Sequence, residues 1–294
     1  ITCAQYVSFL NTLTYEQQLH RQQDFNWNTN PPTSTSGTSF MENWGYKIVI
    51  KTPGVSTTSL TPAVYACDAN DNGVYDEDCD GLGFPVALRQ EHWLTYMEWA
   101  ALRPMTEFEY EKVCRGTLNP VPYEYPWGTT VMNTSSGGMN NANTINEVMN
   151  QVNEGIVHYN WDGGPMRSGF AATSTSNRLQ AAATFYGVME MAGNVCEQVV
   201  GGGTGYNYST FTSVNGDGVL TNKGLANITG WPTDGGTNSG TIIRGGGFYT
   251  NTGQMAQMDV WFMLATAFLL LPAVFMKRKQ LEKWQGAFFL LIYA

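Results

Sequence analysis

The chain has 294 residues, and charged side chains make up 13% of them, which is about half of the usual share. The formal net charge of −9 excludes a general nucleic-acid binder, because such a protein needs a basic face to displace phosphate counterions. The 5 cysteines include no C-x-x-C pair and the 3 histidines lie far apart in the sequence, which argues against structural zinc and metalloprotease sites.

A first helix and a first strand are expected near the N-terminus. The apolar stripe that predicts the helix recurs at i, i+3, i+4 and i+7, and it consists of Tyr6, Phe9, Leu10 and Leu13. A loop rich in Pro, Ser, Thr and Asn covers residues 28–38. Residues 46–51 (YKIVIK) then predict a short strand between turn residues.

An acidic loop follows at residues 67–81 (CDANDNGVYDEDCDG), with the spacing of a calcium-binding EF-hand loop. The candidate metal ligands at positions 1, 3, 5 and 9 of this loop are Asp68, Asn70, Asn72 and Asp76. Position 12 is Cys79 instead of the bidentate Glu, so the loop is either a calcium site completed by Asp78 or Asp80 or a solvated acidic turn. Cys67 and Cys79 flank the loop, and they either form a disulfide in an oxidising compartment or remain thiols.

Two further helices are expected before the middle of the chain. The apolar stripe of the first consists of Trp93, Leu94, Met97 and Ala101. This helix must end before Pro104, because the residue ahead of a proline disfavours the α region. Thr106 and Glu109 form a capping box, which predicts the next helix over residues 107–115. Residues 116–247 are rich in Gly, Asn and Thr, so we expect irregular, loop-dominated structure there.

The last 36 residues have a different character. Residues 260–276 contain no charge over 17 residues, and Lys277-Arg278-Lys279 follow at once. Such a segment is typical of a membrane helix near its minimum length, and the positive-inside rule places the basic end in the cytoplasm. A buried core helix is the alternative, although such a helix would not normally be apolar on all faces. A second apolar run starts at Trp284 and continues to Ala294.

Four motifs, taken in order, carry a resemblance to a known family. They lie at residues 102–116 (LRPMTEFEYEKVCRG), 125–129 (YPWGT), 186–199 (YGVMEMAGNVCEQV) and 243–249 (IRGGGFY). Together with residues 5–13 (QYVSFLNTL), they resemble the formylglycine-generating-enzyme, or sulfatase-modifying factor, family over about residues 1–250. The resemblance implies a loop-rich α+β fold of the C-type-lectin-like kind, stabilised by calcium and located outside the cytoplasm.

In that family, the segment M-x-G-N-x-x-E binds calcium through side-chain and main-chain oxygens. The resemblance places the matching metal ligands at Glu190, Gly193, Val195 and Glu197. A set of oxygen ligands suits a hard cation such as calcium, although Cys196 here replaces the usual Trp. The alternative is that Gly193-Asn194 is only a turn and Glu197 a solvated carboxylate. A second calcium site of the family maps near Asn143 and Thr144.

Enzymes of the family oxidise a substrate cysteine with a copper(I) ion that two thiolates hold, because soft Cu(I) requires soft ligands. In this chain, residues 245–253, where those thiolates would lie, contain no cysteine, and none follows. Copper is therefore not expected, and Cys114 is interpreted as a small core residue of its helix. We expect a non-catalytic domain that binds a protein or a glycan ligand. The alternative is a formylglycine-generating oxidoreductase, which would need cysteines that the sequence does not show.

Residues 259–294 resemble the end of bacterial sodium/calcium antiporters, where a short basic link joins the last two helices. The chain therefore divides into a sulfatase-modifying-factor-like domain (1–250), a junction (251–258) and a tail (259–294). The tail would contain the transmembrane helix, the basic link and a truncated second apolar helix. Two interpretations stay open: a membrane-anchored extracytoplasmic domain, or a chimeric fragment that carries a remnant of a cation antiporter.

Overall fold

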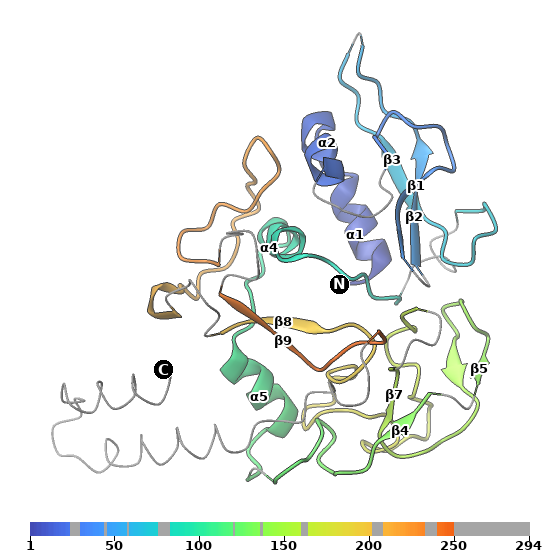
Figure 1. Cartoon of the computed structure of the whole chain (residues 1–294), viewed down its shortest axis with the longest axis vertical. Coiled ribbons are helices and arrows are strands. Elements are labelled where there is room, and N and C mark those ends of the chain that lie inside the picture. Colours follow the sequence, from blue (N-terminus) through green and yellow to red (C-terminus); the bar gives the residue numbers. More distant parts are fainter. Residues whose placement is uncertain are drawn as a thin grey trace, which may run out of the picture.

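The computed structural model consists of short helices and short strands around one large and several small hydrophobic cores (Figure 1). Buried aromatic side chains fill these cores, and the largest include Trp127, Tyr6, Tyr65, Tyr110 and Phe9. The residues that the structure describes are 1–23, 30–43, 46–57, 59–75, 83–119, 121–135, 138–159, 164–201, 208–232 and 240–249.

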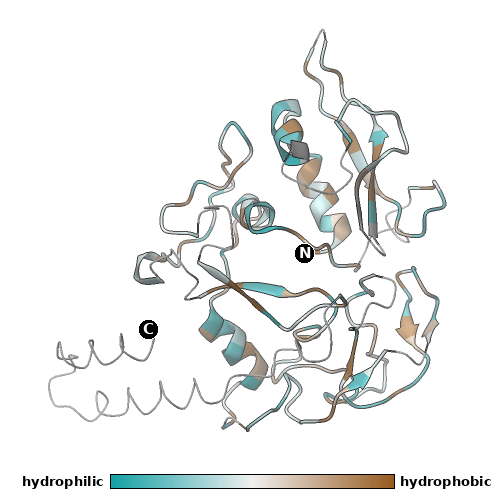
Figure 2. Cartoon of the chain, in the orientation of Figure 1, coloured by the Kyte–Doolittle hydropathy of each residue, from teal (hydrophilic) through white to brown (hydrophobic). Residues whose placement is uncertain are grey.

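The N-terminal part packs α1 (Cys3–Leu10) against a three-stranded antiparallel sheet, and α2 (Tyr15–Gln23) follows α1. The strands lie in the order β1 (Ser39–Asn43), β2 (Tyr46–Thr52) and β3 (Val64–Cys67). A capping box of Thr2 and Gln5 starts α1. The predicted stripe is confirmed, since all four of its apolar residues are buried, and the predicted strand is β2. Hydrophobic residues colour parts of α1 and of this sheet brown in Figure 2.

Two side-chain amides take the place of a neighbouring strand along β3. Asn11 Oδ1 accepts a hydrogen bond from Tyr65 N at 2.8 Å, and Asn11 Nδ2 donates to Tyr65 O at 3.0 Å. Gln18 repeats the arrangement two residues earlier, with its Oε1 2.8 Å from Ala63 N and its Nε2 3.0 Å from Ala63 O. Because a side-chain amide has the donor and acceptor pattern of a peptide group, these bonds satisfy the outer backbone groups of the strand.

Both helices predicted before the middle of the chain are present. The first is α4 (Gln90–Trp99), in which Trp93 and Leu94 are buried and Met97 is partly buried. Ala101, the last residue of the predicted stripe, lies beyond the end of α4 and is exposed. The second is α5 (Glu107–Arg115), and its capping box is confirmed: Thr106 N donates to Glu109 Oε2 at 2.9 Å, and Glu109 N donates to Thr106 Oγ1 at 3.3 Å. Gly116 ends α5 with a φ of 64°, a conformation that glycine adopts without strain.

The part after α5 contains only short strands and one 3-10 turn among its described residues, as expected. They are β4 (Asn133–Thr134), β5 (Met139–Asn140), β6 (Val148–Met149), β7 (Ile156–Val157), β8 (Glu197–Val200), η1 (Tyr208–Thr210) and β9 (Thr241–Arg244). β4 pairs with β7 in parallel, whereas β5 with β6 and β8 with β9 are antiparallel pairs. The antiparallel pair β8 and β9 lies beside α5 in Figure 1, and α5 contacts β8.

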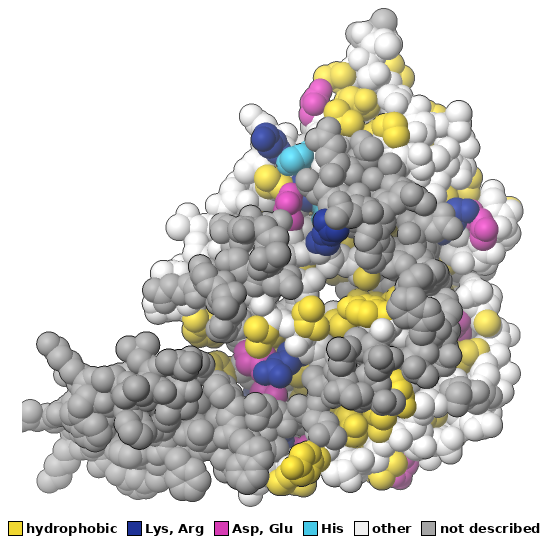
Figure 3. All heavy atoms as spheres, in the orientation of Figure 1, with side chains coloured by type: hydrophobic (Ala, Val, Ile, Leu, Met, Phe, Trp, Pro, Cys, Tyr) yellow, Lys and Arg dark blue, Asp and Glu magenta, His cyan; other side chains and the backbone are white. Residues whose placement is uncertain are grey.

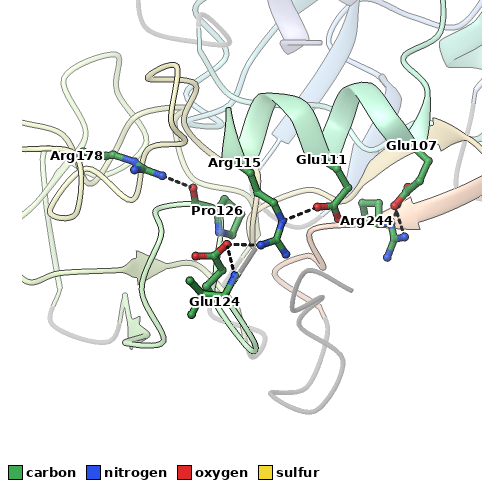
Figure 4. Close-up of polar contacts among 8 residues, drawn as sticks. Glu107, Glu111, Arg115, Glu124, Pro126, Arg178 and Arg244 are labelled. Atoms are coloured by element: carbon green, nitrogen blue, oxygen red, sulfur yellow. Dashed lines mark hydrogen bonds and ion pairs between the residues drawn. The ribbon is translucent and has the colours of Figure 1, made fainter. Parts of the chain in front are cut away.

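Ion pairs attach α5 to its surroundings (Figure 4). Arg115 Nε donates to Glu111 Oε2 at 2.9 Å, and its guanidinium also binds Glu124, with all three side chains nearly buried. Arg244 of β9 binds Glu107 at the start of α5, with Nε 2.7 Å from Oε2. Since each buried charge has a partner, the network avoids the penalty of an isolated buried ion.

The expected fold class, a C-type-lectin-like α+β fold with an appended transmembrane helix, is corrected. The described residues form mixed short helices and strands, and none of the helices among them is long and apolar enough to cross a membrane. The longest, α4, has 10 residues. At about 1.5 Å per residue it spans roughly 15 Å, about half of the hydrocarbon thickness of a bilayer. The junction and tail at residues 251–294, including residues 260–276 and their basic end, lie outside the described residues.

Candidate metal centre

The turn before β8 is built from residues with left-handed backbone angles. Glu190, Gly193 and Asn194 have φ values of 62°, 79° and 61°. At Gly193 a side chain is excluded, because a Cβ atom would lie 2.8 Å from His158 O. Asn194 is fully buried, and its Nδ2 and Oδ1 bind Met166 O at 2.9 Å and Met166 N at 3.0 Å. The turn is therefore fixed by segments that are distant in the sequence.

The turn contains two carboxyl groups with raised pKa values, those of Glu190 and Glu197. Glu190 Oε1 accepts a hydrogen bond from Gly169 N at 2.9 Å, and its Oε2 lies 3.4 Å from Asn194 Nδ2. Burial raises the pKa of Glu190 to about 7, even though these hydrogen bonds lower it. Burial also raises the pKa of Glu197 well above its ordinary value, and the charge of Glu190 adds to the rise. Burial therefore favours the neutral form of both carboxyl groups, and a positive charge nearby would favour their ionised forms.

Glu197 is the first residue of β8, and one of its oxygens has no hydrogen-bond partner among the described residues. Although the residue as a whole is partly exposed, Oε2 is buried and accepts no hydrogen bond from the described part of the chain. A Cβ atom at Gly245 would lie 2.2 Å from this oxygen and 3.0 Å from Met191 O, so the site tolerates no side chain there. Arg244 pairs with Glu197 across the two strands, but its guanidinium binds Glu107 instead (Figure 4).

The predicted ligands, namely Glu190, Gly193, Val195 and Glu197, all lie in this turn and at the start of β8, where the charge of Glu190 acts on Glu197. Within the described ranges, no three or more His, Cys, Asp or Glu side chains are grouped so that they could hold a metal ion. In the site that the resemblance implies, an ion would bind through the carboxylates of Glu190 and Glu197 and through main-chain oxygens. Such an oxygen-only set suits Ca²⁺ and does not suit a soft metal.

The second predicted calcium site, near Asn143 and Thr144, has a different arrangement from the expected one. The side chain of Asn143 is exposed, and its main-chain N donates to Glu147 Oε2 at 2.8 Å. Thr144 Oγ1 donates to Asn141 O at 2.8 Å. The buried acid here is Glu147, whose Oε1 accepts from Arg167 N at 2.9 Å. Backbone N–H groups therefore satisfy the carboxylate in the structure.

The acidic loop brings three of its four predicted ligands together, but their oxygens bind the loop itself. Asp68 Oδ1 accepts from Asn72 N at 3.0 Å, and Asn70 Oδ1 accepts from the same nitrogen at 3.1 Å. Asn72 Oδ1 accepts from Val74 N at 2.7 Å. Lys47 forms an ion pair with Asp71 in the same loop. Asp76 and Cys79, with the disulfide proposed for Cys79, lie outside the described residues.

The segment 245–249 lies against this turn and offers no thiol pair. Its neighbour Cys196 has Sγ 3.1 Å from Tyr249 Oη, and burial raises the pKa of this thiol. Cys114 is fully buried in α5 against Tyr110 and Met191, which confirms its interpretation as a core residue. The residues here do not fit a copper(I) ion, which needs two soft ligands.

On the face shown in Figure 3, hydrophobic side chains form patches and charged ones are scattered.

Sequence reasoning missed three residues whose contacts fix these loops: the buried Asn194 and Glu147 and the partly buried Met166. Their contacts join positions up to 28 residues apart, so no local spacing identifies them. Asn194 alone had a sequence signal, because Asn tolerates the left-handed region better than most residues.

Comparisons with protein-family models, with curated proteins and with solved structures found no match to this chain.

Proposed function

We propose that this chain is a non-catalytic binding domain related to formylglycine-generating enzymes, which acts outside the cytoplasm on a protein or glycan ligand. In this proposal, a calcium ion at the turn 190–197 stabilises the domain. The observation that carries the proposal is the carboxylate pair of Glu190 and Glu197, in which Glu197 Oε2 is buried without a hydrogen-bond partner among the described residues. A bound cation would offset the free-energy cost of that pair.

The ligand set also agrees with the proposed location. Two carboxylates with main-chain oxygens give a weaker calcium site than an EF-hand with four or more side-chain ligands. Sites of extracellular modules bind calcium with a Kd of about 10⁻⁴ to 10⁻³ M, which is far above cytosolic affinities. A site of this affinity is filled only where calcium is abundant, and this condition supports a position outside the cytoplasm.

The lack of a thiol pair supports a non-catalytic role. The sequence contains no cysteine after Cys196, and the hydroxyl of Tyr249 is the group that contacts its thiol. The other described cysteines, Cys3, Cys67 and Cys114, are buried in the cores. If the purified protein with copper converts a cysteine in a sulfatase peptide to formylglycine, this part of the proposal is refuted.

Thermal unfolding with and without calcium tests the metal site. At a free calcium concentration about 100 times the Kd, binding stabilises the folded state by about 2.7 kcal/mol. For a domain of this size, we expect a rise in Tm of about 5 to 10 °C relative to EGTA. The substitution Glu197→Gln should abolish this rise. The exposed control Glu154→Gln should retain it, and so should Asp68→Asn, which tests the acidic loop separately. An unchanged wild-type Tm contradicts the proposal.

A further inference from the structure

A short turn at residues 184–188 presents apolar side chains to the solvent. Phe185, Tyr186 and Val188 are 37%, 55% and 43% exposed. Two hydrogen bonds close the turn, since Thr184 N donates to Val188 O at 2.8 Å and Val188 N donates to Thr184 Oγ1 at 3.0 Å. Thr184 itself is fully buried. The turn is therefore fixed, and a ligand that binds to it orders few additional groups.

The two aromatic residues of this turn have different surroundings. Phe185 lies on Gly116 at the end of α5, where a Cβ atom would come within 2.1 Å of the ring, and its N–H donates to Cys114 O at 3.0 Å. Tyr186 packs against Phe185 at 82° between the ring planes, with 5.0 Å between the centroids. Phe185 thus supports Tyr186, and more than half of the Tyr186 side chain stays open to a ligand.

Two positive charges lie at this aromatic pair. The Arg178 guanidinium lies over the Phe185 ring, with Cζ 5.9 Å from the centroid, and it donates to Pro126 O at 3.0 Å (Figure 4). Lys112 of α5 is exposed, and its Nζ donates to Gly116 O at 3.1 Å. Among the described residues neither cation forms an ion pair with a carboxylate, although the net charge of the chain is −9. Both charges can therefore bind an anionic group.

The size of this surface indicates which kind of ligand fits it. A stable protein–protein interface takes about 800 Å² from each partner, which corresponds to roughly 20 to 30 residues a side. Three exposed apolar side chains and two cations are far fewer. A sugar ring, in contrast, is about as large as one aromatic ring, and its C–H groups are attracted by the negative face of that ring. Two cations suit single sugar carboxylates, whereas a densely sulfated chain needs a larger basic patch.

We propose that the turn 184–188 binds an acidic polysaccharide, in which a uronic acid ring stacks on Tyr186 and carboxylates of the sugar chain pair with Lys112 and Arg178. Phe185 positions both Tyr186 and Arg178, because it contacts each of them. This inference deepens the proposed function, since it names the glycan ligand. It rests on the binding role given there and uses no calcium ion.

Titration calorimetry of the full-length chain with oligosaccharides tests the proposal. The probes are hexamers of glucuronate, galacturonate and mannuronate, each compared with the neutral hexamer of the same sugar and linkage. We expect at least one uronate hexamer to bind at least about tenfold more tightly than its neutral counterpart, because only the uronate can pair with the two cations. Binding should weaken as the salt concentration rises from about 50 to about 300 mM, since ions screen these charges.

Substitutions separate stacking from a general attraction of charges. Tyr186→Ala should weaken binding at least about tenfold, whereas Tyr186→Phe should retain it, because the ring remains. Lys112→Gln should weaken binding about threefold and reduce its dependence on salt. Tyr208→Ala is the matched control, because Tyr208 is an exposed aromatic residue in η1, and its loss should leave the affinity unchanged.

Three results would overturn the inference. They are a Kd above about 10 mM for every uronate hexamer, equal binding of the neutral hexamers, and an unchanged affinity of Tyr186→Ala. If calcium raises the Tm but one of these results is found, the inference is refuted and the proposed calcium-stabilised domain stands. If a uronate hexamer binds as expected but calcium leaves the Tm unchanged, the inference stands and the calcium site is refuted.

Discussion

The N-terminal part of the molecule and the part after α5 are stabilised in different ways. In the first, α1, the sheet and α4 enclose one large cluster of buried hydrophobic residues. In the second, the clusters are small, and buried polar side chains bind the main chain of distant loops. Apolar burial is tolerant of exchange between similar side chains, whereas a buried polar group depends on its particular partners. The candidate metal centre lies in the second part.

The largest expected loss of stability comes from a substitution in the hydrophobic core of the N-terminal part. Phe9 is fully buried and touches the rings of Tyr6, Tyr96 and Trp99. Phe9→Ala should lower the free energy of unfolding by about 4 kcal/mol, because it leaves a cavity in the core. Phe108→Ala is the control: this ring is 48% exposed on α5, and its loss should have little effect. Urea unfolding measures both, and a change below about 1 kcal/mol for Phe9→Ala would contradict the described core.

A smaller loss of stability is expected from a substitution in the part after α5, where buried polar side chains bind the main chain. Asn194→Ala removes both hydrogen bonds to Met166 and takes away the partners of its partly buried N–H and C=O. We expect a loss of about 3 kcal/mol, since an unsatisfied buried group costs about 1 to 3 kcal/mol. Calcium affinity should fall as well, because the turn 190–197 loses its anchor. The exposed Asn222→Ala is the matched control. A variant as stable as the wild type would show that Asn194 does not hold the turn.

The smallest effect concerns α5, which connects the two parts. The Arg103 guanidinium holds the pKa of Glu109 at about 2, below the ordinary 4.5. A lowered pKa contributes stability that is present above pH 4.5 and is lost as the pH falls through about 2. Because the carboxylate is 40% exposed, solvent screens this contribution to less than about 1 kcal/mol. Glu109→Gln should therefore be slightly less stable at pH 7 but equal to the wild type at pH 2. A constant difference across that range would contradict the assignment.

The same contrast explains how much could be predicted from the sequence. The stripe with Tyr6 and Phe9 and the capping box with Thr106 are local patterns, and they placed α1 and α5 correctly. The turn 190–197 was proposed as a metal site from a resemblance, and in the structure the charge of Glu190 acts on Glu197. The roles of Asn194 and Glu147 were missed, because their partners are distant in the sequence. The expected fold class was corrected in its appended transmembrane helix, because none of the helices among the described residues is long and apolar enough to cross a membrane.

The amides of Asn11 and Gln18 have a consequence for how this protein behaves among other chains. An open strand edge is a template on which a second chain can add a strand, and repeated addition leads to aggregation. Along β3 the outward-facing groups of Ala63 and Tyr65 are already bound by these two amides. A mutation that shortens either side chain would therefore do more than weaken the fold, since it would open this edge to self-association.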